Sequence, residues 1–259
     1  VGRLALAIAD GSSASIESAL AILEEPGADG PSLFAHGRAG GVDARTVARL
    51  ASGHRAYLEL LERGPARGES LETFHRRVLA AFDRYRVLCA HRVGPFGSES
   101  LARAVGIELG RRARRSSQSV DDAWIGKPVL IVQNSYDTGL FNGDVGIVVR
   151  RGDRERAVVF PGPGGEGVRY LAAERLPPHE LALATTVHKA QGSQFDQVAF
   201  VLPDTLTTVL SREIVYTAVT RARSRVTIVG GRALLSAALA LPTIRVSGLA
   251  DMLWGDSFR

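Results

Sequence analysis

The sequence has 259 residues, a formal net charge of +5, 45% hydrophobic residues and 23% charged residues. These values are typical of a globular protein and exclude a disordered or fibrous chain, and the apolar runs are shorter than the roughly 20 residues of a membrane span. One cysteine, Cys89, excludes a disulfide framework and a cysteine-based zinc site. No secretory leader opens the sequence, so we expect a cytoplasmic protein of two modest domains, or of one domain with an insert.

The basic residues are almost all arginine, because 30 of the 32 are Arg and only Lys127 and Lys189 are Lys. Residues 91–119 hold six basic and two acidic groups, and residues 181–259 hold eight and five. The stretch between them, 120–180, holds seven basic and nine acidic groups. Two basic blocks of this kind can attract a phosphate backbone, although solvated arginine faces give the same count.

The first part of the chain predicts helices followed by an α/β unit. Apolar residues at helical spacing favour helices at 2–9, 13–25, 43–62 and 69–83, the second of them opened by a Ser12/Ser13 cap. Residues 86–90 predict a buried strand that includes Cys89 as a core residue. A glycine-containing loop and a helix to about residue 115 follow, and this order indicates an α/β unit.

Residues 124–176 have the composition of β-structure. Strands are expected at 128–133, 145–150, 156–160 and 168–171, with a tight turn at Asn142-Gly143. Strands this short and this close together predict a small barrel, in which we expect Trp124 and Tyr136 to pack.

The α/β pattern resumes at residue 181, with strands expected at 181–186, 197–202 and 225–229 and helices at 211–222 and 232–241. The economical architecture is a parallel-sheet domain interrupted by the barrel. We therefore divide the chain into a first part with N-terminal helices (1–120), the β-insert (121–176) and a second part (177–259).

The densest group of polar side chains is Thr185-Thr-Val-His-Lys-Ala-Gln-Gly-Ser-Gln-Phe-Asp196. It follows a predicted strand, and open parallel sheets bind ligands at the carboxyl ends of their strands. Its hydroxyls, imidazole, ammonium and amides suit phosphates or sugar hydroxyls, whereas a polar cap at the edge of the sheet is the structural alternative.

A second motif, Glu213-Ile-Val-Tyr-Thr-Ala-Val-Thr-Arg-Ala-Arg223, carries an apolar stripe at helical spacing. Arg221 and Arg223 stand at its far end. An arginine there is either a solvated charge that suits the helix dipole or a finger that clamps a phosphate during phosphoryl transfer.

In this order the two motifs resemble motifs V and VI of the superfamily 1 helicases. The segments 126–134 and 139–146 resemble the SH3-like insert of RecD-type helicases, and the stretches 2–9, 89–97 and 247–250 are also similar to that family. The resemblance implies an α/β fold: a RecA-like, P-loop-NTPase-type second motor domain with a small SH3-like β-barrel insert.

The resemblance also assigns candidate site residues. Arg221 matches the γ-phosphate-sensing finger and is the expected catalytic residue. Gly192 and Gln194 are also expected to contact ATP. Gln194 stands where the family pattern usually has Glu, and an amide can donate as well as accept hydrogen bonds, so a role that only accepts them is in doubt. No metal ligands are expected. The residues expected to contact DNA are Thr186, His188, Lys189, Gln191, His91 and Arg92.

Two further groups of residues have open alternatives. Phe96 either stacks on a base or anchors its loop in the core. Arg111, Arg112, Arg114 and Arg115 end the helix that follows, where a solvated face competes with a DNA contact.

The family implies the C-terminal motor domain of an ATP-dependent 5′→3′ DNA helicase, a RecD-like subunit of exodeoxyribonuclease V in double-strand break repair and recombination. The full-length protein would use ATP and Mg²⁺. The implied partners are single-stranded DNA, the N-terminal RecA-like domain of the same protein, and RecB and RecC, with no membrane.

No Gly-x-x-x-x-Gly-Lys-Ser/Thr pattern occurs in the sequence, and no strand ends in an acidic pair, since Asp121-Asp122 follows a polar stretch. We therefore expect half of a motor that does not turn over ATP alone. Two alternatives stay open: a free-standing RecD-like helicase, and a non-catalytic nucleic-acid-binding or assembly module.

Overall fold

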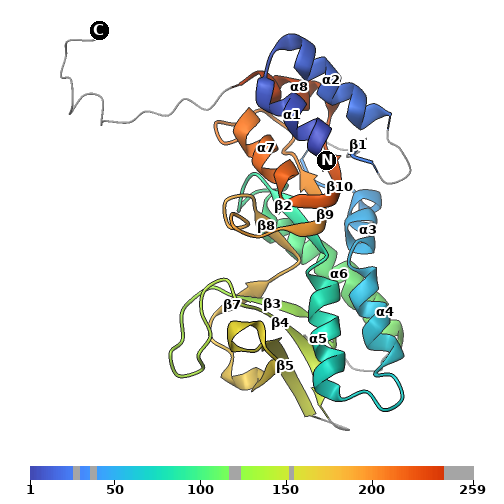
Figure 1. The fold of residues 1–259 in the computed structure, drawn as a ribbon, viewed down its shortest axis with the longest axis vertical. Helices are drawn as coiled ribbons and strands as arrows, with labels where there is room; N and C mark the ends of the chain where they lie inside the picture. Colours follow the sequence, from blue (N-terminus) through green and yellow to red (C-terminus); the bar gives the residue numbers. More distant parts are fainter. Residues whose placement is uncertain (26–29, 36–39, 117–123, 152–154, 242–259) are drawn as a thin grey trace, which may run out of the picture.

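The computed structural model describes residues 1–25, 30–35, 40–116, 124–151 and 155–241. The stretch 247–250 and the pair Asp121-Asp122 therefore lie outside the described residues, as do the side chains of residues 112–116. The molecule is elongated, with a parallel sheet toward one end and an antiparallel sheet at the other (Figure 1).

The parallel sheet has five strands in the order β1-β10-β9-β2-β8, and every neighbouring pair is parallel. The predicted parallel sheet is therefore confirmed. Strand β1 was not predicted, because three residues are too few to show a periodicity. The strands are β1 (Ser32–Phe34), β2 (Tyr85–Cys89), β8 (Ala184–Thr186), β9 (Phe195–Val201) and β10 (Ala222–Val229).

Alternation along the strands gives the sheet two apolar faces. Leu88 and Phe200 belong to one core, whereas their neighbours Val87 and Ala199 belong to the other. The first core is covered by α1 (Gly2–Asp10), α2 (Ser13–Glu24), α7 (Arg212–Thr220) and α8 (Arg232–Ala240). The second is covered by α3 (Ala44–Ser52), α4 (Arg55–Arg63), α5 (Leu71–Phe82) and α6 (Ser98–Ser116).

The predicted single helix 43–62 is wrong, because it is two helices that break at Gly53. A Cβ added to Gly53 would lie 2.2 Å from the ring of Tyr85, so the chain approaches this ring more closely than any other residue allows. Asp43 caps α3 by accepting a hydrogen bond from the backbone N–H of Thr46 at 2.7 Å. Apolar periodicity continues across the break and therefore could not reveal it.

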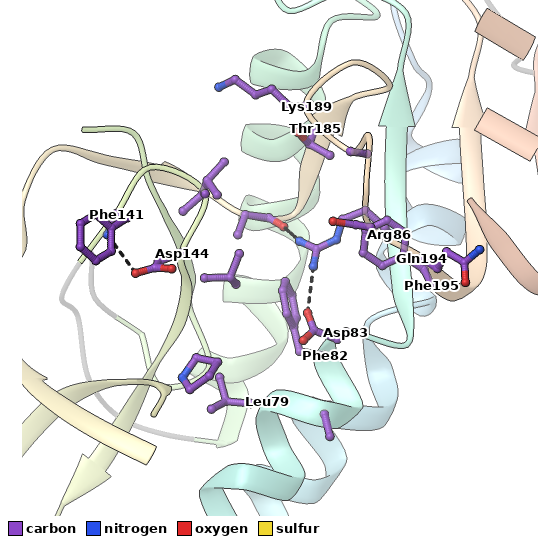
Figure 2. A pocket seen from close by; sticks show the side chains of 18 of the residues that line it. Leu79, Phe82, Asp83, Arg86, Phe141, Asp144, Thr185, Lys189, Gln194 and Phe195 are labelled. Atoms are coloured by element: carbon purple, nitrogen blue, oxygen red, sulfur yellow. Dashed lines mark hydrogen bonds and ion pairs between the residues drawn. The ribbon is translucent and has the colours of Figure 1, made fainter. Parts of the chain in front are cut away.

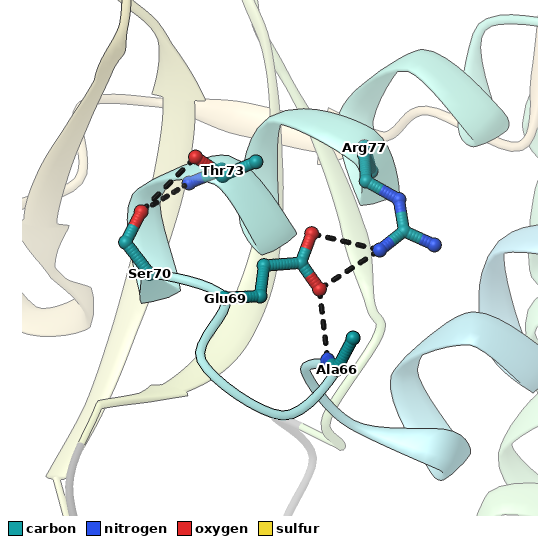
Figure 3. A network of polar contacts seen from close by, with 5 residues as sticks. All are labelled: Ala66, Glu69, Ser70, Thr73 and Arg77. Carbon is teal, nitrogen blue, oxygen red and sulfur yellow. Dashed lines mark hydrogen bonds and ion pairs between the residues drawn. The ribbon is translucent and has the colours of Figure 1, made fainter.

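Helix α5 begins at a turn that its own side chains fix (Figure 3). Ser70 caps the helix by accepting a hydrogen bond from the N–H of Thr73 at 3.2 Å. Glu69 accepts two hydrogen bonds from Arg77, at 2.7 and 2.8 Å, and one from the N–H of Ala66 at 2.8 Å. These bonds orient the helix that packs against the antiparallel sheet.

The antiparallel sheet has the order β6-β5-β4-β3-β7. The four predicted strands are confirmed as β3 (Pro128–Ile131), β4 (Val145–Arg151), β5 (Glu155–Pro161) and β6 (Val168–Ala172), and β7 (His179–Leu181) adds a fifth. Within the described residues, no ladder joins the edge strands β6 and β7, so closure into a barrel stays a prediction.

The predicted strand 181–186 is wrong in one respect: it is two strands in two sheets. Leu181 ends β7, which pairs with β3, whereas β8 begins at Ala184 and pairs with β2. The chain crosses between the sheets at Ala182 and Leu183, both buried. A continuous apolar run cannot show this crossing, because both of its ends are buried strands.

The packing predicted for one of two aromatic residues of the insert needs correction. Trp124 packs against the core that the insert shares with the second face of the parallel sheet. Tyr136 is 82% exposed, so its predicted packing inside the barrel is wrong.

We predict that Gly53→Ala destabilises the chain by about 1–3 kcal/mol, since the new methyl group must displace the Tyr85 ring. Urea unfolding measures this change. Gly41→Ala is the matched control, because its Cβ would lie 4.0 Å from the nearest atom. Equal effects of the two substitutions would contradict the steric explanation.

Candidate functional site

The polar run 187–194 connects the two sides of the parallel sheet at which its strands end and begin. We call these sides the carboxyl edge and the amino edge. It leaves β8 at Thr186, passes through turns, and enters β9 at Phe195. Because β8 and β9 both run parallel to β2, this connection must travel from the carboxyl edge of the sheet to its amino edge. The expectation that the whole run lies at the carboxyl edge is therefore wrong for its second half.

Gly192 allows a backbone turn in the segment that runs between the two edges. Its φ is +86°, a value that favours glycine, and an added Cβ would find no atom within 4 Å. His188, Lys189 and Gln191 are exposed around it, and Thr186 Oγ1 accepts a hydrogen bond from the N–H of Lys189 at 3.3 Å. Apart from the buried Val187 and Ala190, the run is thus an open polar surface.

The carboxyl edge also gathers loops from other strands. His91 follows β2, and its Nε2 lies 2.9 Å from Oγ1 of Thr207 in the loop after β9. These two loops diverge to α6 and α7 on opposite faces of the sheet, which is where open parallel sheets leave a crevice. The sequence reasoning did not single out Thr207, and no signal in its Thr-rich loop distinguishes it.

Two predicted site residues share one carboxylate. Glu180 on β7 lies 2.6 Å from Nη2 of Arg92 and 3.7 Å from Nζ of Lys189. Arg92 also donates from Nε to Glu99 at 2.6 Å. The hydrogen bond that Arg92 donates to Glu99 and the negative charge of Glu180 raise the pKa of Arg92. Glu180 was missed in the sequence because it stands just before the strand predicted at 181–186 and outside the dense polar run.

The amino edge holds the residues expected at ATP. Arg221 is the C-cap of α7, and its Nη1 donates to the carbonyl of Ser193 at 3.0 Å. Its Nε is buried without a hydrogen-bond partner. Gln194 lies beside it and accepts a long hydrogen bond, 3.5 Å, from Arg223. Arg223 belongs to β10 and not to the helix, which corrects its expected position.

A cleft of about 1330 Å³ separates the parallel sheet, along the end of β8 and the polar run that follows it, from the insert (Figure 2). Lys189, Gln194 and Phe195 contribute to one wall, and Phe141 and Asp144 contribute to the facing wall. Five cationic side chains and three carboxylates line the cleft, so it has a mild positive excess. The cations are Arg84, Arg86, Arg169, Lys189 and Arg223, and the carboxylates are Asp83, Asp144 and Asp196.

The guanidinium of Arg86 lies at the point where the two sheets meet. It donates to the carbonyl of Ala182 at 2.7 Å and to Asp83 at 3.1 Å, and it lies over the rings of Phe82 and Phe195 at 4.7 and 5.0 Å. Arg86 is 5% exposed. We call Arg86 and these four partners the Arg86 joint.

Burial shifts the pKa values of Arg86 and of the neighbouring His54. Burial lowers the pKa of Arg86 itself. It also lowers the pKa of the neighbouring His54, with a further contribution from the charge of Arg86, to about 3. His54 therefore stays neutral at physiological pH, stacked at 5.5 Å on Phe82, and Arg86 is the charged member of the pair.

The structure decides between the alternatives for some of the remaining candidate residues. Phe96 is 4% exposed, which confirms the hydrophobic anchor and excludes base stacking. Cys89 is buried as predicted, and burial raises the pKa of its thiol. Arg111 is exposed on α6. Over the described residues, no helix is long and apolar enough to span a membrane, and no group of three metal-binding side chains is found.

Residues 181–229 match the family model of the UvrD-like helicase C-terminal domain. The chain is 41% identical over 179 residues to the RecBCD enzyme subunit RecD of Mycolicibacterium smegmatis, covering 69% of this chain and 31% of that protein. It is 32% identical to the RecD subunit of Haemophilus influenzae, covering 73% of this chain and 28% of the relative. The ATP-dependent RecD2 DNA helicase of Deinococcus radiodurans is 32% identical, over 65% of this chain and 23% of that protein.

The chain thus spans about a third or less of the length of these relatives. A weaker structural similarity links it to a Pif1 helicase from Bacteroides solved with ADP-AlF3 and ssDNA. That similarity has 16% identity and a TM-score of 0.35, and it covers 72% of this chain and 49% of the other.

We predict that Arg86→Lys lowers the free energy of unfolding by about 1–3 kcal/mol, because an ammonium cannot serve both Ala182 and Asp83 while stacking on two rings. Denaturant unfolding measures the change. Arg84→Lys is the control: Arg84 is 70% exposed in a 3.8 Å ion pair with Asp196, so its substitution should cost less than about 0.5 kcal/mol. Similar losses of unfolding free energy at both positions would contradict the structural role that we assign to Arg86.

Proposed function

We propose that this chain, which belongs with the C-terminal regions of RecD-like superfamily 1 DNA helicases, completes an ATP site at one edge of its sheet and binds single-stranded DNA at the other. The observation that carries the proposal is the path of residues 187–194, which joins the two edges in a single connection.

At the amino edge, Arg221 is suited to a phosphate. Its Nη1 contacts a neutral carbonyl, and its buried Nε has no partner, so the guanidinium can turn to an anion at little cost. Gln194 lies beside it, and Gly192 leaves open space for close approach of a ligand. In this proposal Arg221 is the catalytic finger, and the N-terminal RecA-like domain of the same protein holds most of the ATP and its Mg²⁺, which neutralises phosphate charge.

At the carboxyl edge, side chains that can donate hydrogen bonds come from the segments that follow two neighbouring strands. His91 and Arg92 follow β2, and Thr186, His188 and Lys189 follow or end β8. Gln191 continues this polar surface toward Gly192. A phosphate backbone would exchange its counterions for such side chains. Closure on ATP at Arg221 would then move residues 187–194 and shift the bound strand.

The whole protein would then be a 5′→3′ helicase in double-strand break repair and recombination, working in the cytoplasm with RecB and RecC. Residues 1–120 and 177–259 would form its second RecA-like domain, and residues 121–176 its SH3-like insert. Sequence identity does not separate this assignment from a free-standing helicase, because the RecD subunit of Haemophilus influenzae and the RecD2 helicase are both 32% identical to the chain. Co-purification with RecB and RecC separates the two.

We predict that Arg221→Ala in the whole protein lowers DNA-stimulated ATP turnover by about 10³-fold or more while leaving the Kd for single-stranded DNA nearly unchanged, because the finger acts only on the transferring phosphate. Steady-state ATPase and oligonucleotide titration measure the two quantities.

The control for Arg221 is Arg223→Ala, which removes the same charge two residues further along. The Arg223 side chain is 61% exposed and pairs with Asp196 at 3.7 Å, so most activity should remain. Near-normal turnover in Arg221→Ala would contradict the catalytic assignment. It would leave a non-catalytic nucleic-acid-binding or assembly module as the better description.

We also predict that Glu180→Gln strengthens binding of single-stranded DNA about two- to fivefold at low salt, because Arg92 and Lys189 lose a carboxylate that competes with the DNA phosphate. The gain should shrink as salt is raised. Glu174→Gln makes the same charge change at an exposed position of the insert. Equal gains from both substitutions would mean that only net charge matters.

A further inference from the structure

The loop between β3 and β4 carries two aromatic side chains on its surface. Tyr136 is 82% exposed and Phe141 is 46% exposed, and their ring centroids lie 6.0 Å apart with the planes at 82°. The rings form an edge-to-face pair that presents ring faces to solvent. The apolar core of the insert lies close by, and its buried Leu140 is the chain neighbour of Phe141, yet both rings stay outside that core.

Several hydrogen bonds hold this loop in one conformation. Ser135 and Leu140 exchange two backbone bonds, at 2.7 and 3.1 Å, and the N–H of Phe141 donates to Asp144 at 2.9 Å. Arg169 donates to the carbonyl of Gly139 and pairs with Asp144 at 3.0 Å. Leu140 is 1% exposed and anchors the loop. A ring held in place loses little conformational freedom when it binds a flat partner.

The position of the pair suggests what that partner is. Phe141 lines the cleft on the wall opposite Lys189 and Gln194 (Figure 2), and Tyr136 packs beside Phe141. The side of the cleft that holds Gln194 and Phe195 also carries the exposed Arg84 and suits phosphates. The aromatic loop itself carries the carboxylates Asp137 and Asp144, and the charge of Asp144 is balanced by Arg169, so this wall has no cationic excess. Charge therefore favours a strand whose backbone follows the cationic wall and whose bases point at the rings.

We propose that Tyr136 and Phe141 form a stacking site for one base of a single-stranded nucleic acid, with one ring against the face of the base and the other against its edge. Every base has a π-face, so the site would tolerate any sequence. This inference deepens the proposed function and rests on it, because it assumes that the strand bound at the carboxyl edge continues past Lys189, which also lines the cleft, toward the insert.

The test compares two oligonucleotides of equal length and charge, one of thymidylates and one abasic, with the whole protein. The wild type should bind the thymidylate strand more tightly. Tyr136→Ala and Phe141→Ala should weaken binding of that strand about 5- to 100-fold and leave the abasic strand unchanged. The slope of binding against salt should stay the same, because no charge is lost.

Two further variants sharpen the test. Tyr136→Phe keeps the ring and should bind like the wild type. Tyr216→Ala removes a tyrosine that is 40% exposed on α7, away from the cleft lining, and should change neither affinity. Because Tyr136 is so exposed, Tyr136→Ala should fold even if Phe141→Ala does not.

The outcomes separate the two proposals. Tight binding of thymidylates by the wild type with no loss in Tyr136→Ala overturns the stacking site alone. Equal loss on the abasic and thymidylate strands also overturns it, since the rings would then act on something other than a base. Failure of the wild type to bind either strand overturns the DNA-binding function and the stacking site together.

Discussion

The structure depends on one buried contact, the guanidinium of Arg86 against the carbonyl of Ala182. The chain passes from the antiparallel to the parallel sheet at Ala182, and no backbone ladder can satisfy a carbonyl at such a crossing. Burying a cation is unfavourable unless hydrogen bonds and an opposite charge compensate for the lost water. Asp83 and two aromatic rings supply that compensation, so the crossing and the amino edge of β9 are fixed together.

This constraint decides where the polar run can lie. With β8 fixed at one end and Phe195 at the other, residues 187–194 must span the sheet from its carboxyl to its amino edge. A group that binds at either edge therefore acts on one short connection. No chain of side-chain contacts is needed to couple the carboxyl and amino edges in this arrangement, because a single backbone segment reaches both.

The sequence was sufficient to predict the parallel sheet, most helices and the polar run, since each has a local period or a dense motif. It could not predict the break at Gly53 or the division of residues 181–186 between two sheets, because both are set by partners far away in the chain. It also missed Glu180, which is one carboxylate among many until folding places it between Arg92 and Lys189. The exposure of Tyr136 was missed because aromatic residues in β-segments usually pack inward.

Arg86 and Arg221 show that burial alone does not distinguish an arginine whose charge is compensated within the fold from one that is available to a ligand. Both have a buried Nε without a partner. Arg86 nevertheless pairs with Asp83, a carbonyl and two ring faces, so its charge is compensated within the fold. For Arg221, the described residues offer a hydrogen bond to the Ser193 carbonyl and no carboxylate. A cation left in that condition at the edge of a sheet stabilises the fold little, and it gains most when an anion arrives.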